Sequence, residues 1–244
     1  MKTKKPGANE GFVPTLNQMG YMTSSLDPFS KAFVEYCKSN PSPKSALEIG
    51  AAYGIATLEA LKTGRAVVAN DLDPNHLEIL KAQAAELGLS EKLTLAPGAF
   101  PGELNFARES LSAVLACRIL HFLEGPVIEE GLRRAFDWIE KGGKIFIVCE
   151  TPYTQRFQSF IPIYEANKKA RDPWPGLVPN SFQYTDHTAQ DIPKVLHWMD
   201  EEVLNRVLRN AGFKVEEIRM IPRPDFPSWV RLDGRESVGA IAVK

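Results

Sequence analysis

The stretch Leu47-Glu48-Ile49-Gly50-Ala51-Ala52-Tyr53-Gly54 decides the fold of this chain. Residues 45–49 are an apolar run that a glycine ends, which predicts a short buried strand. Residues 55–62 have helical spacing, so the chain is expected to turn from strand to helix between Gly50 and Gly54. Glycine in such a turn lets a ligand approach the backbone, and the free N–H groups of the new helix face that ligand.

A carboxylate follows the next apolar run, in the stretch Asn70-Asp71-Leu72-Asp73-Pro74. Asp71 stands at the expected tip of the second strand. In a doubly wound sheet this position lies beside the first turn, where the carboxylate can accept both hydroxyls of a ribose. The two stretches together predict a nucleoside-binding site.

Three nucleotide chemistries compete for a turn of this kind. A dinucleotide fingerprint requires glycines at positions 52 and 55, but the chain has Ala52 and Ile55. A P-loop requires Gly-Lys-Ser/Thr, whereas Gly54 is followed by Ile55-Ala56. The pattern that fits is E-x-G-x-x-x-G, which begins at Glu48. An acid at this position suits a ligand with an ammonium group and repels a pyrophosphate.

Short apolar runs alternate with helical patterns along the whole chain. Strands are expected at 45–49, 66–69, 93–95, 113–116, 144–149, 213–220 and 238–243. Helices are expected at 27–38, 55–62, 73–88, 126–140 and 200–211. This order predicts an α/β fold with a Rossmann-like, doubly wound sheet that is mostly parallel and has helices on both faces.

The last two strands have no helix between them. Their link, residues 221–237, contains Pro222, Pro224 and Pro227, so it cannot form the crossover helix that a parallel pair needs. The last strand is therefore expected to run antiparallel to its neighbour.

The turn at Glu48, Gly50 and Gly54 resembles motif I of the class I S-adenosylmethionine-dependent methyltransferases. The five-strand series that ends in an antiparallel pair is similar to the sheet of that family, and the resemblance covers residues 45–244. It implies that the chain is a methyltransferase with S-adenosyl-L-methionine as cosubstrate.

The resemblance also implies roles for individual residues. Glu48 would hold the loop and the ammonium side, Asp71 the ribose, and Leu72 the adenine. The methionine part would be lined by Gly50, Ala51, Ala52 and Gly54. After the third strand the family usually has an acid that meets the adenine amino group, and here Ala99 and Phe100 occupy that region. The segment after the fourth strand, from Ala116 through Cys117 to Leu123, is similar to the one whose backbone meets the methionine amino group.

One domain is expected over residues 1–244. It comprises an N-terminal helical segment (1–44), a cofactor-binding core (45–150), a lid-like insertion (151–199), and a C-terminal helix with the antiparallel strand pair (200–244). The insertion is rich in aromatic residues and long for a loop, which indicates either a lid over the methyl donor or a satellite core. Tyr21 and Met22 are expected to close the other side. An aromatic enclosure favours a small-molecule acceptor.

Methyl transfer needs alignment more than acid–base groups, and a base is required only when the nucleophile keeps its proton. Three histidines could supply that base, but His197 precedes Trp198 and a helix start and is expected to pack, which leaves two candidates. His187 lies in the insertion beside Asp186, and His121 follows the fourth strand.

Composition excludes several classes of protein. A formal net charge of -1 gives no electrostatic case for nucleic acid, and the Asp/Asn-Pro-Pro-Tyr/Phe signature of amino-directed nucleic-acid methyltransferases is absent after strand four. No apolar run is long enough to span a membrane. Three cysteines, none in a C-x-x-C pair, favour the cytoplasm and no metal site. Nothing in the sequence indicates an oligomeric state. A protein-directed methyltransferase and a non-catalytic nucleoside-binding or scaffold protein remain as alternatives.

Overall fold

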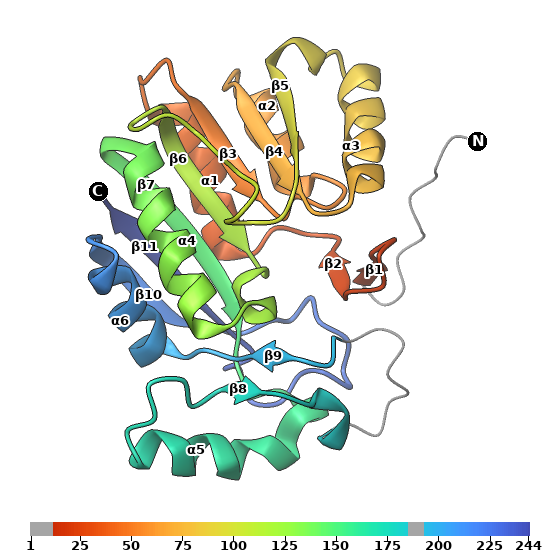
Figure 1. The fold of residues 1–244 in the computed structure, drawn as a ribbon. Helices are drawn as coiled ribbons and strands as arrows, with labels where there is room; N and C mark the ends of the chain where they lie inside the picture. Colours follow the sequence, from red (N-terminus) through yellow and green to blue (C-terminus); the bar gives the residue numbers. More distant parts are fainter. Residues whose placement is uncertain (1–11, 185–192) are drawn as a thin grey trace.

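The computed structural model describes residues 12–184 and 193–244, and its centre is a seven-stranded sheet (Figure 1). The strands of this sheet are β3 (Ser45–Ile49), β4 (Val67–Asp71), β5 (Leu93–Pro97), β6 (Leu111–Cys117), β7 (Ile139–Glu150), β10 (Lys214–Ile221) and β11 (Ser237–Val243). Their order is β10-β11-β7-β6-β3-β4-β5, in which β3 to β7 are parallel and β11 is antiparallel to both neighbours. The expected doubly wound sheet and its antiparallel last strand are confirmed.

Helices cover both faces of the sheet because its strands are apolar on both sides. On one face lie α4 (Gly125–Trp138) and α6 (Glu201–Asn210), which pack on alternate residues such as Leu47 and Ile145. On the other lie α1 (Pro28–Ser39), α2 (Ile55–Lys62) and α3 (Pro74–Glu86), over residues such as Ala46 and Val67.

The signals that start helices in the sequence act as expected. Asp27, Asp73 and Asp200 are the N-caps of α1, α3 and α6, and each carboxylate accepts hydrogen bonds from backbone N–H groups of the first turn. These caps fix the residues at which the three helices begin. The carboxyl ends of β3 to β7 meet at one edge because these strands are parallel.

Two expected boundaries are wrong. Helix α4 was expected to reach residue 140, but it ends at Trp138, because Ile139 enters the sheet opposite Leu111 and is fully buried there. The N-terminal segment is not only helical. It contains a hairpin of β1 (Phe12–Pro14) and β2 (Tyr21–Thr23), which Figure 1 shows near the carboxyl ends of the parallel strands.

The 151–199 insertion has structure of its own. It contains a 3₁₀ segment (Gln155–Phe160), α5 (Ile161–Lys169), and the short antiparallel pair β8 (Leu177–Val178) and β9 (Leu196–His197). Its aromatic side chains form a separate buried cluster of Tyr153, Phe157, Phe160, Tyr164, Val178, Leu196 and Trp198. The satellite core, which was the alternative to a lid, is therefore present. None of the described helices is long and apolar enough to cross a bilayer.

Candidate functional site

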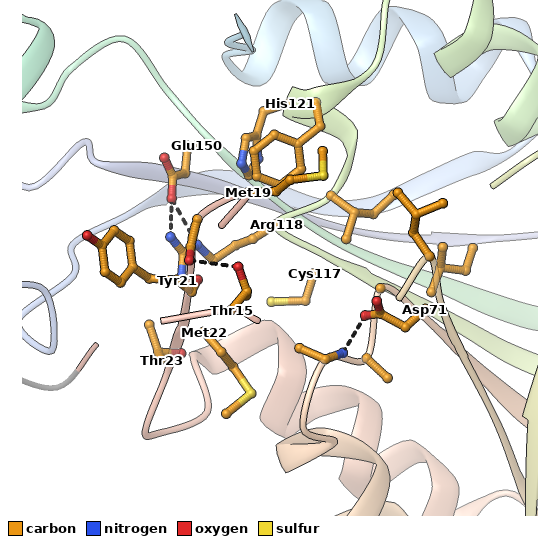
Figure 2. A pocket seen from close by; sticks show the side chains of 18 of the residues that line it. Thr15, Met19, Tyr21, Met22, Thr23, Asp71, Cys117, Arg118, His121 and Glu150 are labelled. Carbon is orange, nitrogen blue, oxygen red and sulfur yellow. Dashed lines mark hydrogen bonds and ion pairs between the residues drawn. The ribbon is translucent and has the colours of Figure 1, made fainter. Parts of the chain in front are cut away.

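A cavity of about 310 Å³ opens at the carboxyl edge of the sheet, between β3 and β6, where the strand order reverses. This is the position at which doubly wound sheets bind ligands. Its walls come from the loops after β3, β4, β5 and β6, the β1–β2 hairpin, the start of α1, both ends of the 151–199 insertion, Glu150 at the end of β7, and Val230. Figure 2 shows how Asp71 and His121 face the cavity from opposite ends.

The loop after β3 requires glycine at both ends. Gly50 and Gly54 have φ values of +71° and +78°, in the left-handed region. A Cβ at Gly50 would lie 2.1 Å from Cγ2 of Ile119, and one at Gly54 would lie 2.2 Å from Cδ1 of Leu80. Between them, Ala51 and Ala52 line the cavity with their backbone. The glycines thus hold the loop against β6 and α3.

Glu48 is buried behind this loop and ties it to α2. Its Oε2 accepts the backbone N–H of Thr57 at 2.8 Å and also the Thr57 hydroxyl. Burial raises the pKa of Glu48 to about 7, although the two bonds from Thr57 favour its charged form. The same residue lines the cavity, so a cation placed there meets a carboxyl group that ionises near neutral pH.

Asp71 is buried at the tip of β4 and already accepts three hydrogen bonds. Ala52 N–H donates to Oδ2 at 2.8 Å, and Asp73 N–H and His76 Nδ1 bond to Oδ1, each at 2.9 Å. A carboxylate has about four acceptor positions, so one position remains, on Oδ2. In this orientation the carboxylate can accept a hydrogen bond from one ribose hydroxyl, whereas the sequence predicted that it accepts from both.

The residues assigned to the adenine side also border the cavity. Leu72 is 53% exposed, and Phe100 is held edge-on against Trp138. The backbone N–H of Ala99 is taken by the Glu103 carboxylate at 2.7 Å. That acid therefore occupies a backbone donor in the region that was expected to border the adenine.

The loop after β6 brings Cys117 and Arg118 to the opposite wall. The Sγ atom of Cys117 lies 3.6 Å from Oδ2 of Asp27. Burial raises the pKa of this thiol. Arg118 is a non-glycine residue with φ of +59°, a conformation that concentrates at functional sites. Its guanidinium pairs with Glu150 and donates to the Tyr21 carbonyl at 3.0 Å (Figure 2).

The Arg118–Glu150 ion pair was not anticipated from the sequence. Burial alone would raise the pKa of Glu150, but the charges of Arg118 and its hydrogen bond outweigh it and lower that pKa to about 2. The position of Glu150 at the carboxyl end of a parallel strand was the signal that could have found it. The Glu150 side chain is therefore a carboxylate near neutral pH.

Of the two candidate bases, His121 lies in the cavity wall and is 3% exposed. Its ring packs on Phe122, and Nδ1 has no hydrogen-bond partner among the described residues. Burial lowers its pKa to about 4, so the ring is neutral near pH 7. Thr154, also in the wall and 2% exposed, has an unpartnered Oγ1. His187 lies outside the described residues.

No set of three or more His, Cys, Asp or Glu side chains within residues 12–184 and 193–244 is arranged to hold a metal ion. The groups gathered at the cavity include backbone N–H groups, carboxylates, the Arg118–Glu150 ion pair, two histidines and apolar side chains. They are suited to an organic ligand with a nucleoside part.

Residues 46–143 match a family model described as a methyltransferase domain. A search of curated proteins found no match. Among solved structures, an S-adenosylmethionine-dependent methyltransferase from Methanosarcina mazei is 15% identical, with a TM-score of 0.66 over 90% of this chain and 98% of the other. One from Mesorhizobium loti is 15% identical, with a TM-score of 0.61 over 88% and 98%.

A third similar structure is geranyl diphosphate C-methyltransferase from Streptomyces coelicolor A3(2), in complex with geranyl diphosphate and S-adenosyl-L-homocysteine. It is 12% identical, with a TM-score of 0.59 over 87% of this chain and 80% of the other. At these identities the structures share the fold. Together with the family match over residues 46–143, they support a Rossmann-like methyltransferase domain whose methyl donor is S-adenosylmethionine.

Proposed function

We propose that this enzyme methylates a small molecule that binds beside the methyl donor in the cavity at the carboxyl edge of the sheet. The observation that carries the proposal is the continuity of this cavity, which runs from the β3–α2 loop and Asp71 to the hairpin and the insertion. Donor and acceptor can therefore occupy one enclosed space.

The donor end follows from the groups around the β3–α2 loop. Gly50, Ala51, Ala52 and Gly54 would face the methionine part, with Glu48 behind them and the Cys117 backbone across from them. The free acceptor position of Asp71 would take a ribose hydroxyl. Leu72, Ala99 and Phe100 would border the adenine, and the exposed face of Leu72 becomes covered by it.

The acceptor end has a mostly apolar wall. It is formed by side chains of the hairpin, the loop after β6 and the insertion: Met19, Tyr21, Met22, Phe122, Phe157 and Leu196. A wall built from three separate segments encloses a compact molecule, whereas a protein substrate needs an open groove. A similar structure, geranyl diphosphate C-methyltransferase, is named for a small-molecule substrate, which supports the same class.

The cosubstrate supplies an electrophilic methyl group, and the chain supplies alignment. Holding an acceptor atom in line with that group contributes much of the rate, since it removes the entropy cost of the encounter. His121 is neutral and offers its unpartnered Nδ1 to a polar group of the acceptor, and Thr154 offers its hydroxyl. Buried polar atoms without partners are costly, so a ligand that satisfies them gains affinity.

Two further expectations belong to the proposal. His187 remains a candidate base for an acceptor that keeps its proton. The enzyme is expected to work in the cytoplasm, in line with its three free cysteines.

Methyl transfer from a labelled donor tests the proposal. The purified enzyme is incubated with S-adenosylmethionine labelled in the methyl group and, separately, with the small-molecule and the protein fractions of a cell extract. Label should appear in the small-molecule fraction and should be lost with Asp71→Ala. Label in the protein fraction alone would favour the protein-directed alternative, and no label in either would favour the non-catalytic one.

A further inference from the structure

His76 joins the nucleoside side of the cavity to the N-terminal hairpin. It lies in the first turn of α3 and is 1% exposed. Its Nδ1 is 2.9 Å from Oδ1 of Asp71, and its Nε2 is 2.9 Å from the backbone nitrogen of Leu16, in the turn of the hairpin. One buried ring thus contacts both the proposed ribose carboxylate and the chain that covers the cavity.

The two contacts fix the protonation of the ring. A backbone N–H can only donate, so Nε2 of His76 must accept from Leu16 with its lone pair. The single proton of the neutral imidazole is then on Nδ1, from which it is donated to Asp71. The relay Leu16 N–H to His76 to Asp71 therefore has one direction, and each polar atom in it is used.

Other hydrogen bonds that do not involve Asp71 also attach the hairpin. The Tyr53 hydroxyl donates to the Pro14 carbonyl at 2.7 Å, and the Arg118 guanidinium donates to the Tyr21 carbonyl at 3.0 Å. Between these attachments the hairpin presents Met19 and Met22 to the cavity. It forms a wall of the proposed acceptor end, and the His76 relay connects that wall to the carboxylate proposed to bind the ribose.

We propose that His76 is a positioning residue that couples docking of the β1–β2 hairpin to nucleoside binding at Asp71. A docked hairpin holds the ring of His76 in the orientation that donates to Oδ1, which leaves the free position of Oδ2 directed at the ribose. By reciprocity, a nucleoside held by Asp71 stabilises the docked hairpin by the same factor. The acceptor wall is then completed after the cosubstrate binds, which gives an ordered reaction. This inference rests on the proposed function, because it takes Asp71 as the ribose ligand.

Hydrogen exchange of the full chain with and without S-adenosylhomocysteine tests the coupling. In the wild type, saturating ligand should slow exchange of the amides of residues 12–23, that of Leu16 most strongly. Exchange in β10 and α6, remote from the cavity, is the internal reference.

Two substitutions separate the ends of the relay. In His76→Asn the amide can still donate to Asp71 but is too short to reach Leu16. It should bind S-adenosylhomocysteine within a few-fold of wild type and lose the slowing in the hairpin. In His76→Phe both bonds are lost, so the affinity should fall by about tenfold or more, the usual effect of removing a buried hydrogen bond to a charged group.

Two controls accompany them. Asn75→Ala changes an exposed residue of the same helical turn and should behave as wild type. Tyr53→Phe removes a separate hairpin attachment, so exchange of residues 12–23 should be faster without ligand and should still slow when ligand is added.

Equal slowing of the hairpin in wild type and His76→Phe would overturn the coupling, as would unchanged hairpin exchange in wild type saturated with ligand. If His76→Phe melts at a much lower temperature, its exchange reports on unfolding. The comparison of hairpin exchange between wild type and His76→Asn then tests the coupling. Failure of the proposed function is distinguishable, because the wild type would then not bind S-adenosylhomocysteine at all.

Discussion

Thr57 donates both its backbone N–H, at 2.8 Å, and its side-chain hydroxyl to one oxygen of Glu48. The pair joins the end of β3 to the first turn of α2, and so it holds the cavity-lining loop between them in shape. Because burial raises the pKa of Glu48 to about 7, this carboxyl group changes charge in the pH range in which the enzyme would work.

Binding of the cosubstrate should therefore release protons near pH 7. The ammonium group of S-adenosylhomocysteine favours ionised Glu48, so its pKa should fall on binding. Affinity should rise with pH up to about 7 and level off above it, since only the ionised form attracts the cation. Calorimetry in buffers of different ionisation enthalpy measures the released protons directly.

The matched variant is Glu48→Gln, which keeps the shape and can accept from Thr57 without ionising. It should bind with no proton release near pH 7 and with a flatter dependence of affinity on pH. If the variant released as many protons on binding as the wild type, the group that titrates near pH 7 would not be Glu48.

Asp71 should recognise the ribose through a single hydroxyl. Asp71→Ala should weaken binding of S-adenosylhomocysteine at least tenfold, since a hydrogen bond to a charged group contributes about 1.5–3 kcal/mol. Two analogues of the ligand each lack one of the two ribose hydroxyls. Only one of these deoxy analogues should bind more weakly than the parent ligand to the wild type. In Asp71→Asn that difference should shrink, as measured by calorimetry. Equal penalties for both analogues would mean that the carboxylate turns and accepts both hydroxyls.

Acid should destabilise the protein through two buried histidines. Burial lowers the pKa values of His121 and His197 to about 4 from the ordinary value of about 6.5. Between these values the unfolded chain binds more protons, so the free energy of unfolding rises with pH from about 4 to 6.5. On acidification from about pH 6.5 to about 4, the free energy of unfolding falls by about 3 kcal/mol for each of the two histidines. Urea unfolding at a series of pH values measures it.

Glu48 acts in the opposite sense in an overlapping range. Its pKa is raised in the folded state, so the free energy of unfolding falls as pH rises from about 4.5 to 7. The free energy of unfolding should therefore rise more steeply with pH in Glu48→Gln than in wild type. A slope unchanged by this substitution would contradict the assignment of Glu48 as the opposing group.

The polar atoms at the acceptor end should matter for turnover and not for donor binding. His121→Phe and Thr154→Val each remove an unpartnered atom and keep the shape of the side chain. Both should lower methyl transfer to the small-molecule fraction and leave the affinity for S-adenosylhomocysteine within a few-fold. His197→Phe is the matched control, because His197 is equally buried and also has an unpartnered ring nitrogen, but it does not line the cavity. Equal losses in all three variants would indicate a general effect on folding.

The sheet was predictable because its signals are local. The glycine loop, the Asp-Pro helix starts and the prolines of the last link each limit the backbone to few conformations. The end of α4 was not predictable from its own residues. Ile139 continues the helical pattern, and only its pairing with Leu111, distant in sequence, draws it into β7.

The candidate site was predictable on its donor side for the same reason. Glu48, Gly50 and Asp71 follow strands whose order the fold class fixes, so they meet at one edge. The hairpin gave no such signal, since β1 and β2 are three residues each and are held by contacts with Tyr53, His76 and Arg118. Strands that short depend on partners that a periodicity argument does not see.

Calorimetric titration of the wild-type enzyme with S-adenosylhomocysteine, NAD and ATP tests the central claim most directly. Binding of one S-adenosylhomocysteine per chain, with no heat from NAD or ATP, is the result expected of a loop with Glu48 before Gly50 and without the glycines or lysine that a pyrophosphate requires. Absence of S-adenosylhomocysteine binding, or equal binding of NAD or ATP, would contradict it.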